Sequence, residues 1–560
     1  MNMTPATTAL PWQPIYDELG IVVPDIDHRP LGFFVEQHAA KLPDAIALQY
    51  FDREITYFEL NELANRFANA LVSLGVVKGD VVGIHLPNIP QYAIALVACA
   101  KIGCAGSGVS PLMTPSEISH QLEDAGISVL LSLDTLIQAS IGGIKELPTC
   151  LQHIIAAAAS DYIAPGAQLE FNIPGLKSYH YLSLVENASP SYTQQAVQAS
   201  DVMMVQYTGG TTGRPKGAEL SIRCLMYNSQ QASAYAPWEI GTEVVATAFP
   251  MFHAAGLAFT ISALRFAARM FLIPDPRDIK HFCQQMQRFP PTRIAAVPSL
   301  YQMLLDCPDI AGVNFNFLKV ANSGAAPLTG ADREKIEQVI GRNKLSDVFG
   351  MTETGPVHVC SPPTRAKPGS VGIPVPGADT RIIDLETGTR EMPTGEAGEI
   401  ITRGPQLMNG YRNLPDESAK AMRQWQGKTW MYTGDVGYAD EEGYIYLCDR
   451  AKDMLIVGGY KVFSIELEDK LKTLDYIAST AVIGTADEKR PGNDIVNLYV
   501  ELAATAKNRT PEIVSEEILA FCRENMAPYK VPKAIHIIER IPLTSVGKVD
   551  KKALRQTAGA

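Results

Sequence analysis

Residues 206–217 read QYTGGTTGRPKG, a short loop whose glycines, threonines and single lysine could hold a phosphate group. Glycines let backbone N–H groups turn toward an anion, threonine hydroxyls add donors, and Lys216 supplies a positive charge. The loop does not match the Walker pattern, because two residues separate Gly213 from Lys216. The alternative is a flexible surface turn. The combination of threonine, proline and lysine at these positions in one short segment makes that alternative less favoured. The sequence therefore predicts a phosphate-binding loop.

Alternating strands and helices must position this loop. The apolar run 202–205 (VMMV) predicts a strand, so the loop follows a strand's carboxyl end, where open α/β sheets bind ligands. Apolar runs at 81–86 (VVGIHL) and 127–133 (ISVLLSL) predict buried strands, and 114–117 (TPSE) predicts a capped helix start. Non-alternating apolar strands indicate a parallel sheet with helices on both faces.

The pattern changes after about residue 370, where short apolar segments are joined by Gly, Pro and Asp turns. This is typical of an antiparallel β unit. From residue 450 strands and helices alternate again, which predicts a lid domain over 450–560 beside a body over 1–449. The expected fold class is α/β, with a body of two doubly wound α/β subdomains and a β-barrel-like subdomain, and a small mobile C-terminal α+β domain.

Composition limits the partners. The chain has 560 residues, 46% of them apolar. This length is too great for one compact core, so two or more packed units are expected. A net charge of −12 argues against nucleic acid as a partner. Nine cysteines without a CxxC pair, no signal peptide and no long apolar run favour a cytoplasmic protein without a transmembrane segment. Peripheral contact with the inner membrane and a homodimer both stay open.

Seven motifs in order resemble the adenylate-forming (AMP-binding) superfamily, which includes acyl-CoA ligases, adenylation domains of peptide synthetases, and luciferases. The first is the loop itself. The others are FPMFHAAG (249–256), SGAAP (323–327), FGMTETG (349–355), YTGD (432–435), the segment from DRAKDML to ELED (449–469) and PLTSVGKVDKKAL (542–554). Gly209, where serine is commoner, and PDPRDI (274–279) are similar to the bacterial medium- and long-chain fatty-acid-CoA ligase branch.

The resemblance implies ATP, Mg²⁺ and coenzyme A, an acyl-AMP intermediate and release of pyrophosphate. Glu353 and Thr211 would bind the metal, and Lys548, Thr352, Glu353 and Lys216 would be the catalytic residues. Phe349 replaces the family's usual tyrosine against adenine, and a phenyl ring keeps the stacking face. The implied nucleotide-binding residues are Thr208, Gly209, Gly210, Thr211, Thr212, Gly213, Lys216, Gly324, Ala325, Ala326, Pro327, Asp347, Phe349, Gly350, Met351, Thr352, Asp435, Arg450 and Lys548.

Two half-reactions imply that the lid rotates. Lys548 would bridge the attacking carboxylate and the α-phosphate, and would then leave so that the CoA thiol can enter. Lys452 matches the family's hinge position. Gly458, Gly459 and Tyr460 would line the path of CoA, because side chains at the glycines would block it.

The acid is predicted less directly. Amino-acid-activating relatives usually have Asp after the last Phe of the FPMF segment, whereas this chain has His253, so an amino acid is disfavoured. The expected acid-binding residues are Phe252, His253, Ala254, Gly256, Leu257, Ser323 and Gly324. A medium- or long-chain fatty acid is expected. An aryl or other acid, a carrier protein as acceptor, and a nucleotide sensor without activity stay open.

Overall fold

Two units divide the chain: Met1–Thr380 with Thr402–Met431, and Arg381–Ile401 with Tyr432–Ala560. The computed structural model describes residues 10–164, 166, 170–208, 214–326, 328–458, 460–487, 490–543 and 549–558. The predicted boundary between residues 449 and 450 stays a prediction. No helix within these described ranges is long and apolar enough to span a membrane.

An eight-stranded sheet in the first unit has the order β19-β9-β8-β4-β3-β5-β6-β7. Strands β3 to β7 pair in parallel, as the apolar runs predict, and every residue of β3 is buried. The strands are β3 (Val81–His85), β4 (Ala105–Gly108), β5 (Val129–Leu133), β6 (His153–Ala157), β7 (Lys177–His180), β8 (Val202–Thr208), β9 (Lys216–Ser221) and β19 (Gly410–Tyr411).

A nine-stranded sheet in the same unit has the order β16-β15-β14-β13-β12-β10-β11-β1-β2. Its pairs from β1 to β14 are parallel, and β2, β15 and β16 add antiparallel edges. The strands are β1 (Ile46–Tyr50), β2 (Arg53–Thr56), β10 (Val244–Thr247), β11 (Arg269–Phe271), β12 (Arg293–Ala296), β13 (Val320–Gly324), β14 (Leu345–Gly350), β15 (Val357–Cys360) and β16 (Ile373–Pro374).

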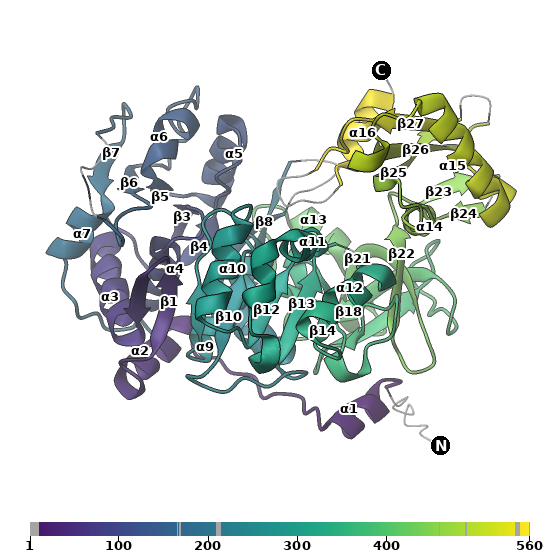
Figure 1. The fold of residues 1–560 in the computed structure, drawn as a ribbon. Coiled ribbons are helices and arrows are strands. Elements are labelled where there is room, and N and C mark those ends of the chain that lie inside the picture. The colour runs from purple at the N-terminus through teal and green to yellow at the C-terminus, as the bar shows by residue number, and fades with distance from the viewer. Residues whose placement is uncertain are drawn as a thin grey trace. The chain divides into compact units, whose positions relative to one another are not determined.

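Helices of the first unit begin where the sequence places caps. Thr114 and Glu117 form a complete capping box at the start of α5, and Thr56 caps α3. Helix α4 is buried all round, which explains its apolar sequence. The helices, found by label in Figure 1, are α1 (Gln13–Leu19), α2 (Leu31–Lys41), α3 (Tyr57–Ser73), α4 (Pro90–Ile102), α5 (Pro115–Ala125), α6 (Asp134–Ser140), α7 (Tyr181–Asn187), α8 (Ile222–Ser233), α9 (Ala254–Arg265), α10 (Ile279–Arg288), α11 (Pro298–Asp306), α12 (Gly330–Ile340) and α13 (Pro415–Ala421).

The predicted antiparallel unit is present as a five-stranded sheet of order β17-β18-β21-β20, with β22 pairing β21. Its pairs β20–β21 and β21–β22 are antiparallel. The strands are β17 (Asp379–Ile383), β18 (Gly398–Arg403), β20 (Met422–Trp425), β21 (Lys428–Ala439) and β22 (Ile445–Arg450).

The second unit has an α+β core of its own. Strands β25, β26 and β27 form a sheet against which α14, α15 and α16 pack, and β23 and β24 form a separate hairpin. Figure 1 shows these elements in yellow and light green. They are β23 (Leu455–Val457), β24 (Tyr460–Val462), α14 (Ser464–Leu471), β25 (Ile477–Ala486), β26 (Asp494–Leu502), α15 (Pro511–Asn525), β27 (Ala534–Ile538) and α16 (Lys551–Ala558).

Candidate active site

The phosphate loop joins two antiparallel strands. Strand β8 continues past the predicted run 202–205 to Thr208, which lies opposite Lys216 at the start of β9. This pairing fixes both ends of the loop on one sheet. The predicted site residues that lie outside the described residues are Gly209, Gly210, Thr211, Thr212, Gly213, Pro327, Gly459 and Lys548.

Lys216 makes an ion pair that the motifs do not predict. Its Nζ lies 2.5 Å from Oε2 of Glu417 on α13 and 5.1 Å from the ring centroid of Tyr411 on β19. Strand β19 pairs with β9, so Tyr411 is held beside the lysine by backbone hydrogen bonds. Sheet pairing therefore brings a distant aromatic ring to the predicted phosphate lysine, and helix α13, which follows β19, supplies the carboxylate.

Tyr411 also binds the predicted metal ligand. Its hydroxyl donates to Oε1 of Glu353 at 2.6 Å, and Glu353 is only 5% exposed. Burial, followed by the neighbouring Glu353 carboxylate, raises the pKa of Tyr411, so the hydroxyl keeps its proton. Sequence reasoning missed Tyr411 and Glu417. The local signal at α13 was a proline and an acidic first turn. These features indicate the start of a helix, but they do not indicate that Glu417 pairs with Lys216.

Packing supports the FGMTETG segment from behind. A Cβ on Gly350 would come within 1.8 Å of the Pro356 carbonyl oxygen, so only glycine fits. The Phe349 ring meets His358 edge to face at 4.9 Å. His358 Nδ1 lies 3.1 Å from the Thr354 hydroxyl, and burial lowers the pKa of this histidine to about 3. A neutral imidazole therefore packs against Phe349, the ring that is predicted to stack on adenine.

The predicted adenine-binding turn follows β13. A Cβ on Gly324 would lie 2.8 Å from the Val348 carbonyl oxygen, so strand packing alone already requires glycine there. Ala325 has a φ of 66°, which is unusual for a residue with a side chain and indicates a constrained turn. Asp347 forms an ion pair with Arg333 of α12. Ser323 is buried, whereas Ala326, Met351 and Thr352 are partly exposed.

The predicted acid-binding segment opens α9. His253 is the N-cap residue, and its Nδ1 accepts from Ala255 N at 3.4 Å. A Cβ on Gly256 would lie 2.1 Å from the Pro250 carbonyl oxygen. Ala254 and Leu257 are buried and Phe252 is partly exposed. These residues thus have local packing functions beside any contact with an acid.

The second unit holds the predicted ribose pair. Asp435 on β21 and Arg450 on β22 lie opposite each other in the strand register, with Arg450 Nε 3.0 Å from Asp435 Oδ1. Asp435 is 7% exposed, so the ion pair fixes its carboxylate. Lys452, two residues further on, is exposed.

The predicted CoA residues lie on the β23–β24 hairpin. Gly458 has a φ of 61° and its N–H donates to Asn493 Oδ1 at 2.5 Å. A positive φ in a two-residue hairpin turn favours glycine. Tyr460 is 59% exposed and stacks on Tyr529 with ring centroids 4.5 Å apart.

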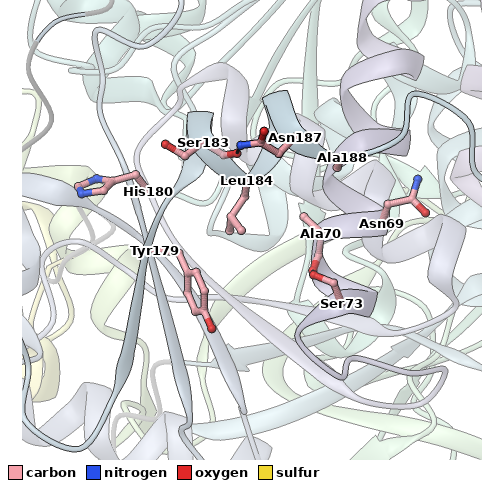
Figure 2. A pocket seen from close by; sticks show the side chains of 9 residues that line it. All are labelled: Asn69, Ala70, Ser73, Tyr179, His180, Ser183, Leu184, Asn187 and Ala188. Carbon is pink, nitrogen blue, oxygen red and sulfur yellow. Dashed lines mark hydrogen bonds between the residues drawn. The ribbon is translucent and has the colours of Figure 1, made fainter.

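A pocket of about 410 Å³ lies elsewhere in the first unit, between α3, β7 and α7 (Figure 2). Its lining consists of alanine, asparagine, serine, tyrosine, histidine and leucine side chains, without Lys, Arg, Asp or Glu. None of the predicted site residues lines it. The pocket therefore offers a triphosphate no lysine or arginine, and it is separate from the site described above.

Comparison with known proteins identifies the family of the chain. Residues 35–412 match the AMP-binding enzyme family and residues 466–548 match the AMP-binding enzyme C-terminal domain. A long-chain-fatty-acid–CoA ligase of Bacillus subtilis is 32% identical over 94% of this chain and 94% of its own length. The 4-coumarate–CoA ligase 2 of rice, Oryza sativa, is 30% identical over 96% and 94%.

A solved structure has the same fold. ATP-bound MatB from Rhodopseudomonas palustris superposes with a TM-score of 0.80 at 26% identity, over 94% of this chain and 98% of that one. The predicted fold class, a large body with a small C-terminal domain, is confirmed by this match. The chain belongs to the AMP-binding enzyme family.

Proposed function

We propose that the protein is an ATP-dependent acyl-CoA ligase. In the first step a carboxylate oxygen of the acid attacks the α-phosphorus of ATP, and the bond to pyrophosphate breaks. In the second step the CoA thiol loses its proton and attacks the acyl carbonyl, and AMP leaves. The first step brings two anions together, so it requires fixed positive charge.

One observation carries the proposal: Tyr411 contacts both Lys216 and Glu353, which lie 137 residues apart in the sequence. A cation for phosphate and a buried carboxylate for a metal are thus held by one side chain. Within the described residues no three His, Cys, Asp or Glu side chains form a metal site of their own. A single carboxylate fits Mg²⁺, which is commonly held by one or two carboxylates together with substrate phosphates. When bound, Mg²⁺ would neutralise phosphate charge.

The remaining roles are proposed from the family motifs. Thr208 and the glycines and threonines of the loop would bind the β- and γ-phosphates together with Lys216. Thr352 would donate to the α-phosphate, and Lys548 would act in acyl-AMP formation. Adenine would lie near Phe349 and Gly324, ribose at Asp435 and Arg450, and CoA along Gly458, Gly459 and Tyr460, with Lys452 as the hinge.

A medium- or long-chain fatty acid is the proposed substrate. The Bacillus subtilis relative supports a fatty acid, and the buried, uncharged Ala254 and Leu257 agree with an acid whose acyl chain is uncharged. The rice relative supports an aryl acid as the alternative. Nine free cysteines support a reducing, cytoplasmic location. Peripheral contact with the inner membrane and a homodimer stay predictions.

Pyrophosphate release tests the function. Purified protein with ATP and Mg²⁺ is given fatty acids of increasing length, benzoate and 4-coumarate, or amino acids, each with and without CoA. We expect acid-dependent release with fatty acids and formation of acyl-CoA when CoA is present. Preference for the aryl acids would favour the alternative, and acyl-AMP that never reaches CoA would indicate a carrier protein as acceptor. ATP binding without release for any acid would contradict an enzymatic function.

A further inference from the structure

Glu417 holds the predicted phosphate lysine in a three-residue ion cluster. Its Oε2 accepts from Lys216 Nζ at 2.5 Å and its Oε1 accepts from Lys420 Nζ at 2.6 Å. The two lysine contacts, that of Lys216 first, lower the pKa of Glu417 to about 2, so the carboxylate is charged throughout the neutral range. Each oxygen of one carboxylate thus binds a different lysine.

Lys216 does not need Glu417 to stay in place. Its backbone is fixed by the β8–β9 pairing, and its ammonium group lies over the Tyr411 ring. Tyr411 in turn is fixed by the β19–β9 pairing and by its hydrogen bond to Glu353. Removal of the carboxylate would therefore leave the lysine beside the loop.

The ion pair is also weak enough to exchange. The side chains of Lys216 and Glu417 are 34% and 31% exposed, so water screens their attraction. Lys420 is 71% exposed and remains bound to the other carboxylate oxygen. If Lys216 binds another anion, Glu417 still has Lys420 as a partner, so the Glu417 carboxylate does not become unpaired.

We propose that Glu417 competes with nucleotide phosphate for Lys216. When ATP binds, its phosphate displaces Glu417 from Lys216, and Glu417 then pairs with Lys420 alone. This inference rests on the proposed function, because it takes Lys216 as a ligand of the ATP phosphates. A phosphate oxygen and a carboxylate oxygen accept the same ammonium hydrogens. Glu417 therefore lowers the affinity for ATP and keeps Lys216 paired when no nucleotide is bound.

The test measures ATP binding to the full chain by calorimetry without acid, and the KM for ATP by pyrophosphate release. Glu417→Gln keeps the shape of the side chain and removes its charge. We expect the Kd and KM for ATP to fall roughly two- to fivefold, the range of exposed ion pairs, with kcat unchanged. Asp416→Asn is the matched control, because Asp416 is exposed and its substitution removes the same charge from the same helix.

A double-mutant cycle with Lys420 tests the exchange. Lys420→Gln should raise the Kd for ATP, because Glu417 then has only Lys216 to bind. That increase should vanish in the Glu417→Gln background. An increase that persists there, an equal gain from Asp416→Asn, or an unchanged or weaker affinity in Glu417→Gln would each overturn the inference while the proposed function stands. Failure of the unaltered protein to bind ATP, with no pyrophosphate released for any acid, would overturn both.

Discussion

The predicted phosphate region of the first unit and the predicted CoA region of the second differ in how their residues are held. In the first, Glu353 is 5% exposed and Lys216 contacts an aromatic ring and a carboxylate. In the second, Tyr460 is 59% exposed on a hairpin whose strands have three residues each. Distant segments contact both regions, but the phosphate region holds a buried carboxylate, whereas the hairpin leaves the Tyr460 ring largely exposed although it stacks on Tyr529.

The two proposed half-reactions explain this contrast. Charge that develops at phosphorus is stabilised best by groups that are already in position, since they need no rearrangement during the reaction. A flexible thiol arm instead needs space along the backbone, which the turn at Gly458 provides. We therefore expect substitutions in the phosphate region to alter acyl-AMP formation, and substitutions on the hairpin to alter only the use of CoA.

The largest expected effect is that of Lys548→Ala, because this lysine is proposed to act on charge that exists only in the first transition state. We expect acyl-AMP formation to fall roughly 10²- to 10³-fold, as when one oxyanion donor is removed. Thioester formation from supplied acyl-AMP should be largely retained. Both rates are measured by quenched flow, with Lys552→Ala as the control, because Lys552 is an exposed lysine of α16. Equal loss of both half-reactions would refute the division between the two regions.

A smaller effect is expected for Tyr411→Phe, which keeps the ring beneath Lys216 and removes the hydroxyl that donates to Glu353. The half-saturating Mg²⁺ concentration should rise about tenfold, the lower end of the cost of losing a group that orients a metal ligand. The readout is the Mg²⁺ dependence of pyrophosphate release.

Tyr50→Phe is the control for Tyr411→Phe, because it also removes a tyrosine hydrogen bond to an oxygen acceptor, here the Ala159 carbonyl at 2.9 Å. Melting temperatures of both variants separate lost stability from lost metal affinity. If the two variants share the same Mg²⁺ dependence, Tyr411 does not position Glu353.

Local elements of the fold follow from the sequence because their causes are local. The capping box of Thr114 and Glu117 and the buried strand Val81–His85 both follow from neighbouring residues, and both are present. The antiparallel sheet and the α+β core after residue 370 follow in the same way from turn residues and apolar runs.

The contacts of the site could not be predicted in this way. The β19–β9 pairing joins Tyr411 to Ala218, and nothing in the spacing of either segment indicates the other. Gly324 illustrates a second limit, since the sequence assigned it to adenine whereas the Val348 carbonyl already excludes a side chain there. Long-range register decides both cases, and a single sequence does not record it.

The smallest expected effect is that of Tyr460→Ala on the exposed hairpin. Loss of the ring that stacks on Tyr529 should raise the KM for CoA roughly two- to tenfold, the range for one aromatic contact, and leave acyl-AMP formation unchanged. Tyr446→Ala is the matched control, because Tyr446 stacks on Tyr438 at 4.9 Å in the same unit and is not among the proposed CoA residues. An effect of Tyr460→Ala on pyrophosphate release without CoA would show that the hairpin also serves the first half-reaction, and the contrast between a fixed phosphate region and an open acceptor region would then fail.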